Sequence, residues 1–299
     1  MKFALALLFC VIASSANAHG GAEDSVPGWE WDFWVTGPLA VSAVLYAAGV
    51  ASMWRRAGTG SGIQWWQPLC FAAGWLTLFG ALCSPLHWLG EHLFTAHMIE
   101  HELLMAVAAP LLAVSKPLGA FMRALRKPLR KALTKGAHSA PVRAFWRWLM
   151  DPTVATLLHG VALWVWHIPY LFDATVGNEL VHRLQHVSFL SSALIFWWAL
   201  FRGRRADLGV GAIHVFATMV HMSLLGALFA LSPRLLFPVQ TAYAPQFGLT
   251  PLEDQQLAGL VMWVPAGTIY AGVAIAMVGL WLSPQRASPP RTSPAGAHA

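Results

Sequence analysis

The chain has 299 residues, of which 57% are hydrophobic and 11% are charged, and its net charge is +6. Because soluble domains contain about 25% charged residues, this composition excludes an ordinary soluble fold and indicates helices packed in a lipid bilayer. The basic residues lie between apolar segments, where they mark topology, and no nucleic-acid-binding motif accompanies them. We therefore expect an all-α, polytopic membrane protein that contacts lipid and not nucleic acid.

Residues 1–18 predict a cleaved signal peptide. Lys2 supplies the positive charge, an apolar run follows, and Ala16-Asn17-Ala18 forms a small-residue cleavage site. Cleavage would make His19 the new N-terminus, where the terminal amine and the imidazole together can chelate copper. A histidine that follows the cleavage site by chance is the alternative. Residues 19–32 are then expected to form an exported N-terminal segment.

Seven apolar segments predict a membrane domain over residues 33–282. The spans that we expect are 33–53, 65–83, 88–114, 153–172, 180–201, 210–231 and 256–282. The basic stretch 115–150 is too polar for the membrane and is expected to be a cytoplasmic loop. The Pro- and Ser-rich residues 283–299 are expected to form a disordered tail.

The distribution of positive charge orients these spans. Sixteen Lys and Arg residues fall on one side of the layout, whereas only Arg183 and Arg234 fall on the other. The positive-inside rule then places the N-terminus outside and the C-terminus in the cytoplasm.

Histidines in two predicted spans recur at a spacing that suits metal binding. In the third span His97 and His101 are four residues apart, so they lie on one helix face about one turn apart. His182 and His186 repeat this spacing in the fifth span. Two imidazoles arranged in this way are a suitable pair of metal ligands.

The predicted topology brings both pairs to the same side of the membrane. A helix rises about 1.5 Å per residue, which places five histidines in the outer half of the bundle: His97, His101, His167, His182 and His186. His159 and His214 lie deeper. A single intramembrane histidine is more often held by a hydrogen bond between helices, but two matched pairs favour a shared metal or haem site.

Other residues are candidate supplements to this site. Met98 and Met105 carry thioethers, which suit Cu(I), although methionine in a membrane helix more often serves packing. His221 lies near the middle of the sixth span and is a further candidate ligand. Glu100 is one turn from His97 and is expected to orient a ligand or to carry protons.

Four motifs occur in order along the predicted spans: His97-Met98-Ile99-Glu100-His101, Trp166-His167-Ile168-Pro169, His182-Arg183-Leu184-Gln185-His186 and Asp254-Gln255-Gln256-Leu257-Ala258-Gly259. Together they resemble the seven-helix CtaG family of cytochrome c oxidase assembly factors. The resemblance implies a non-enzymatic protein of the bacterial plasma (inner) membrane that helps haem-copper oxidase to mature. It also implies copper at the five outer histidines, with oxidase subunits as partners and a soluble exported copper chaperone as a further candidate partner.

Two other functions use histidines in a similar way. A bis-histidine haem protein would place His97 or His101 opposite His186. A membrane di-iron oxidoreductase would also use HxxxH motifs, but such enzymes need HxxHH motifs, which this sequence lacks, and theirs face the cytoplasm. A proton-coupled transporter is a weaker alternative.

Overall fold

The structure is a computed structural model that describes residues 27–203 and 205–283. Within these two ranges all regular elements are helical, which confirms the predicted all-α class. The predicted signal peptide, His19 and all but the first residue of the predicted tail lie outside the described residues. Besides the elements named below, the described chain contains two short 3-10 helices, η2 (Arg205–Asp207) and η3 (Ala244–Phe247).

Five continuous helical segments are long and apolar enough to cross a membrane. They are α2 (Phe33–Ala57), the segment Phe94–Val114, α12 (Glu179–Phe201), α13 (Leu208–Ala230) and α14 (Pro251–Leu282). Two bent pairs also qualify: α3 (Gln67–Cys83) with α4 (Pro85–His92), and α10 (Pro152–Trp166) with α11 (Pro169–Val176). The described chain thus has five candidate spans, or the expected seven when each bent pair counts as one span.

The third expected span is not one helix, so the prediction of a continuous helix over 88–114 is wrong. Leu93 adopts an extended conformation, with φ −128° and ψ 127°, and separates α4 from α5 (Phe94–Glu102). The chain then continues without a break through a π-helical segment, η1 (Leu103–Ala108), into α6 (Ala109–Val114). Irregular backbone inside a membrane protein is tolerated where it is buried or lines a site.

The fourth expected span is broken as well. Ile168 is extended, with ψ 123°, and α10 and α11 meet at an angle of 72°. Pro169 explains the break, because a proline disfavours helical backbone in the residue before it. The bend follows directly after His167.

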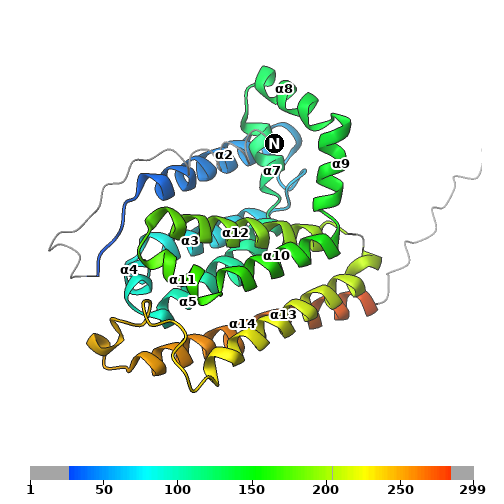
Figure 1. Cartoon of the computed structure of the whole chain (residues 1–299). Helices are drawn as coiled ribbons and strands as arrows, with labels where there is room; N and C mark the ends of the chain where they lie inside the picture. The colour runs from blue at the N-terminus through cyan, green and yellow to red at the C-terminus, as the bar shows by residue number, and fades with distance from the viewer. Residues whose placement is uncertain (1–26, 204, 284–299) are drawn as a thin grey trace, which may run out of the picture.

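The basic stretch 115–150, which is expected to connect two spans on the cytoplasmic side, is mostly helical. It forms α7 (Pro117–Ala124), α8 (Lys127–Ala137) and α9 (Ala140–Leu149). Figure 1 shows α8 at the top and α9 at the right of the molecule, away from α4 and α11 on the left. α7 packs tightly on α2, because a Cβ added at Gly49 would lie 2.0 Å from the carbonyl oxygen of Ala120.

The core is held by close helix contacts and by buried aromatic side chains. α13 and α14 run side by side along the lower part of the molecule (Figure 1). Glycine permits this approach, because a Cβ at Gly259 would lie 2.4 Å from the backbone nitrogen of Ala230. Trp197 on α12 is fully buried and donates its indole N–H to the carbonyl of Met105, 2.9 Å away. That bond ties the fifth expected span to the π-helical segment of the third.

Candidate metal centre

A carboxylate from α14 fixes the start of α5, the helix that carries the first histidine pair. Asp254 is fully buried and accepts the backbone N–H groups of Phe94, at 2.8 Å, and Thr95, at 2.9 Å. Leu93 cannot provide a side-chain cap for these donors. Unpaired N–H groups in the first turn of a helix need an acceptor, and a negative charge there is favoured by the helix dipole. Asp254 therefore holds α5 in position after the break.

A glycine lets α4 approach α5 closely. A Cβ added at Gly90 would lie 2.9 Å from Oε2 of Glu100 and 3.3 Å from the Cα of His97. Gln240 holds the same point, because its side-chain amide donates to the carbonyl of Gly90 at 2.8 Å. The break at Leu93 and this contact together turn α4 over the histidines of α5.

The two predicted histidine pairs meet between α5 and α12, as expected. His97, His182 and His186 form a group, which we call the inner triad, whose ligand atoms all lie within 4.8 Å of one another. The ring of His97 is 5.2 Å from that of His182 and 5.8 Å from that of His186. The predicted juxtaposition of the pairs is therefore confirmed, while their binding of a metal stays a prediction.

Several nitrogens of the inner triad have no hydrogen-bond partner in the described part of the chain. They are Nδ1 of His97, Nε2 of His182 and Nε2 of His186, all of them buried. Nε2 of His97 lies 3.3 Å from Oε1 of Gln185 and donates to it when that nitrogen carries the proton, which leaves Nδ1 free to bind. A buried polar atom without a partner costs about 1–3 kcal/mol, and a metal ion would supply the missing partner.

His101 and His167 lie beside the inner triad but belong to none of the ligand groups among the described residues. The ring of His101 is 4.2 Å from that of His97 and 5.1 Å from that of His186. Both nitrogens of His101 are buried without a hydrogen-bond partner in the described chain. His167 instead donates from Nδ1 to the carbonyl of Leu163, at 2.7 Å, and its ring packs against phenylalanine rings.

His87 is a site residue that sequence reasoning missed. It lies on α4, with Nδ1 2.8 Å from Oε1 of Glu100, and its ring is 5.5 Å from that of His182. On a continuous helix from α4 into α5 it would lie more than two turns above His97, so only the break brings it to the site. Ser84-Pro85 is a typical start of a helix, but no residue pattern in the sequence indicates that this helix packs against α5.

Glu100, which is expected to orient a ligand or to carry protons, lies beside two histidines. It is fully buried, pairs with His87, and lies with Oε1 3.7 Å from Nδ1 of His186. Its carboxylate thus contacts histidines of two other helices and not its own neighbour His97. His87, Glu100 and His186 form a second group of ligand atoms within 4.8 Å, here called the middle triad, and His87, Glu91 and His182 form a third, the outer triad.

The remaining predicted ligands pack mainly against apolar residues or lie outside the ligand groups. Met98 is buried in an apolar cluster with Phe94 and Phe172, and Met105 in the main core. His221 lies on α13 beside Gly160 and belongs to none of the three ligand groups. A metal-binding role for these three residues stays a prediction.

Two deeper histidines show how a structural histidine looks in this bundle. His159 lies with Nδ1 3.1 Å from the hydroxyl of Ser192, and His214 with Nδ1 3.0 Å from the hydroxyl of Thr156. Each pair joins two helices by a single polar contact. The histidines of the inner triad differ, because they face one another.

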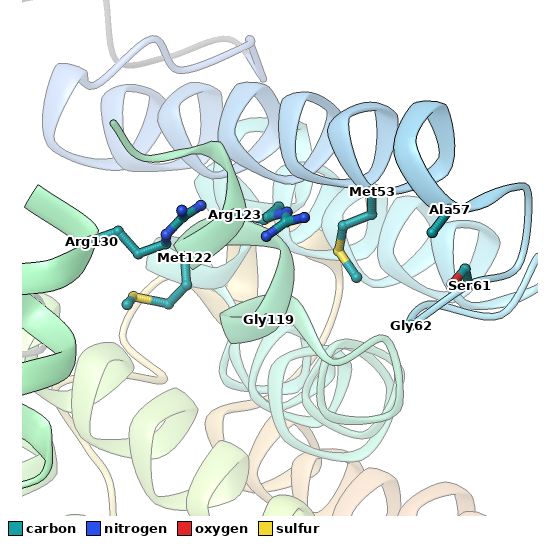
Figure 2. Close-up of a pocket in the computed structure, with 8 residues that line it drawn as sticks. All are labelled: Met53, Ala57, Ser61, Gly62, Gly119, Met122, Arg123 and Arg130. Atoms are coloured by element: carbon teal, nitrogen blue, oxygen red, sulfur yellow. The ribbon is translucent and has the colours of Figure 1, made fainter. Parts of the chain in front are cut away.

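A separate pocket lies at the opposite end of the molecule. Figure 2 shows it between the end of α2 and the helices α7 and α8, with Met53, Arg123 and Arg130 among its lining residues. Its volume is about 420 Å³, and no histidine lines it. It is therefore distinct from the candidate metal centre.

Comparison with known proteins finds one matching family model and several relatives. The family model described as cytochrome c oxidase caa3 assembly factor (Caa3_CtaG) matches residues 44–283. Uncharacterized proteins of Mycobacterium bovis and Mycobacterium tuberculosis are each 27% identical over 286 residues, which covers 86% of this chain and 40% of the relative. One from Mycobacterium leprae is 26% identical over 280 residues, covering 85% and 39%. The chain thus spans about two fifths of the length of these curated relatives, and no solved structure matches it significantly.

Proposed function

The chain belongs to the cytochrome c oxidase caa3 assembly factor family, whose model matches residues 44–283, and we propose that it helps haem-copper oxidase to mature. In this proposal it holds copper at the candidate metal centre. Copper is the cargo in this proposal, and the protein is not an enzyme. The expected partners are oxidase subunits, which receive the metal, and a soluble exported copper chaperone, which supplies it.

The inner triad is the observation that carries this proposal. Its three imidazoles offer ligand atoms within 4.8 Å of one another. Two nitrogens bound to one ion are at most about 4.2 Å apart when each bond is about 2.1 Å, so small side-chain rotations suffice. Imidazole suits copper well, and three neutral ligands add no charge to the apolar interior. The triad alone would also accept zinc, and we propose copper because the family description names cytochrome c oxidase, which is a haem-copper enzyme.

The surroundings of the triad favour a single ion over a haem. Phe172 packs against His97 with ring centroids 5.2 Å apart, and Phe189 packs against His101 at 4.7 Å. His101 and His186 are in direct ring contact at 5.1 Å, whereas two haem ligands need the macrocycle between them. A haem would therefore have to displace several buried rings.

The location of the site supports a role on the outer side of a bacterial plasma (inner) membrane. The helices that surround the histidines, α4 and α11, lie at the end of the bundle away from the basic helices α8 and α9 (Figure 1). The positive-inside rule assigns the basic end to the cytoplasm. Copper held at the other end is then close to the compartment in which the exported chaperone is expected.

Metal analysis of the purified full-length chain tests the proposal. We expect bound copper in the wild type and a loss of at least about 10-fold in copper affinity for His97→Ala and for His186→Ala. His159→Ala is the matched control, because it is a buried histidine outside all ligand groups. Equal copper in His97→Ala and His159→Ala, or a haem absorption band in place of copper, would contradict the proposal.

A further inference from the structure

The three ligand groups overlap, and the overlap forms a path. The outer triad shares His182 with the inner triad and His87 with the middle triad. The middle triad shares His186 with the inner triad. An ion that changes from one group to another can therefore keep one histidine while its other ligands are replaced.

Burial increases along this path. Glu91 in the outer triad is exposed, and His87 and His182 are partly exposed. Glu100 in the middle triad is 0% exposed and His97 in the inner triad is 1% exposed. The outer triad is thus the part that a metal donor in solution can reach first.

The outer end of the path is negatively charged. Oε2 of Glu30 lies 3.8 Å from Nε2 of His87, on the side of that ring away from Glu100. Glu91 belongs to the outer triad itself. Exposed carboxylates raise the local concentration of cations, so these groups favour the approach of a metal ion.

The ligand chemistry gives the path a direction. The outer triad offers one carboxylate and two imidazoles, the middle triad has the same composition, and the inner triad offers three imidazoles. Carboxylate oxygen is a poor ligand for Cu(I), whereas imidazole is a good one. A copper ion therefore binds weakly and exchangeably at the outer triad and more tightly at the inner triad.

We propose that His87, Glu91 and His182 form a loading site that receives copper and passes it, by exchange of ligands, to His97, His182 and His186. The proposal rests on the proposed function of the inner triad. The ion keeps its oxidation state during the transfer. Each imidazole binds through an unprotonated nitrogen, so a proton on that nitrogen moves to the other ring nitrogen or to solvent.

The rate of copper loading tests this proposal. The full-length protein in lipid nanodiscs is mixed with Cu(I) bound to bicinchoninate, and the colour of the chelate is followed by stopped flow. We expect Glu91→Gln and His87→Gln to load at least about 10-fold more slowly than the wild type. Glu91 belongs to the outer triad alone, so Glu91→Gln should reach the same final amount of bound copper as the wild type. His92→Gln is the matched control, because His92 lies on the same helix but outside all ligand groups, with Nδ1 on the carbonyl of Trp88.

The outcomes separate the two proposals. A wild type that binds no copper contradicts the proposed function. Copper binding at the same rate in Glu91→Gln, His87→Gln and the wild type leaves copper binding in place and overturns the loading site. A lower final amount of copper in Glu91→Gln overturns it too, because Glu91 would then belong to the final site.

The pocket of Figure 2 carries a second inference that is independent of the histidines. Arg123 of α7 and Arg130 of α8 both line it, and Figure 2 shows both guanidinium groups beneath α2. None of the lining residues is acidic, and Nε of Arg123 is buried without a hydrogen-bond partner in the described chain. Two like charges beside one space of about 420 Å³ repel each other unless an anion lies between them.

The geometry points to a binding site for a phosphate group in this pocket. The planar guanidinium group matches the oxygens of phosphate in two-bond contacts. Ser61 adds a hydroxyl donor, and Met53 and Met122 provide apolar walls. Pockets with basic residues on the cytoplasmic side of membrane proteins bind lipid head groups in this way. An anionic phospholipid and free phosphate share the required chemistry.

Lipid retention and thermal stability distinguish the two sources. The full-length protein is placed in nanodiscs that contain phosphatidylglycerol and phosphatidylcholine, and bound lipid is measured by native mass spectrometry after release. We expect the double variant Arg123→Gln/Arg130→Gln to retain at least about 10-fold less phosphatidylglycerol than the wild type. Lys127→Gln/Lys131→Gln removes the same charge from exposed residues of α8 outside the pocket and should retain it.

If inorganic phosphate is the ligand instead of lipid, it should raise the melting temperature of the wild type and of the lysine variant but not of the arginine variant. That result would support the site with free phosphate as the ligand. Equal loss in the arginine and lysine variants would overturn it, because lipid would then bind by charge alone. The absence of both retained phosphatidylglycerol and a phosphate effect in the wild type would overturn it as well.

Discussion

Thr95, the second residue of α5, donates both its backbone N–H, at 2.9 Å, and its hydroxyl, at 2.7 Å, to Oδ1 of Asp254 on α14. The two residues are 159 positions apart in the chain. Their contact joins the last described helix to the helix that carries His97, Glu100 and His101.

Removal of this carboxylate should destabilise the protein and weaken the metal centre. Asp254→Ala leaves two backbone donors at the start of α5 without their acceptor. Loss of a helix cap costs about 0.5–2 kcal/mol, and each buried unpaired donor costs about 1–3 kcal/mol. We expect a lower melting temperature and less bound copper per protein. Glu253→Gln changes an adjacent but exposed carboxylate and should have little effect on either measurement.

A methyl group at Gly90 should separate α4 from α5. The added Cβ of Gly90→Ala would lie 2.9 Å from Oε2 of Glu100, so the fully buried carboxylate or α4 must shift. Overpacking of this kind costs about 1–3 kcal/mol. We expect lower copper affinity and a lower melting temperature. Gly80→Ala has no atom within 4 Å of its new Cβ and serves as the control. An identical effect of both changes would show that the Gly90 contact does not support the site.

His97 and His101 should differ although they belong to one motif. Only His97 belongs to a ligand group, so His97→Ala should reduce bound copper and oxidase activity in membranes while the protein still accumulates. His101→Ala should retain more copper than His97→Ala, because the inner triad keeps its three ligands. His159→Ala removes one contact between helices, which is worth about 0.6 kcal/mol on average, and should be tolerated. A larger copper loss in His101→Ala than in His97→Ala would place the site deeper than the inner triad.

The orientation of the bundle can be tested by reporter fusion. A reporter that works only in the cytoplasm should be active when it is fused after Leu282, at the end of α14. A reporter that works only after export should be inactive there. The physical reason is the excess of Lys and Arg on that side of the expected layout. Activity of an export-dependent reporter at the same position would reverse the orientation and place the histidines on the cytoplasmic side.

The sequence by itself determined the local features of this protein. Long apolar segments predict membrane helices because the bilayer thickness sets their length. The spacing of His97 with His101 and of His182 with His186 follows from the pitch of a single helix, so each pair was found without a structure. The family motifs were visible for the same reason, since each lies within one short segment.

Only the tertiary structure decided where the helices break and which residues reach the histidines. After the break at Leu93, the start of α5 is capped by Asp254, a residue far along the chain whose motif is visible in the sequence but whose contact with α5 is not. His87 joins the site only because α4 folds back over α5 at Gly90. Such contacts join segments whose separation along the chain carries no periodic signal. A single sequence therefore predicts the faces of each helix, while packing between the helices decides the full set of ligands.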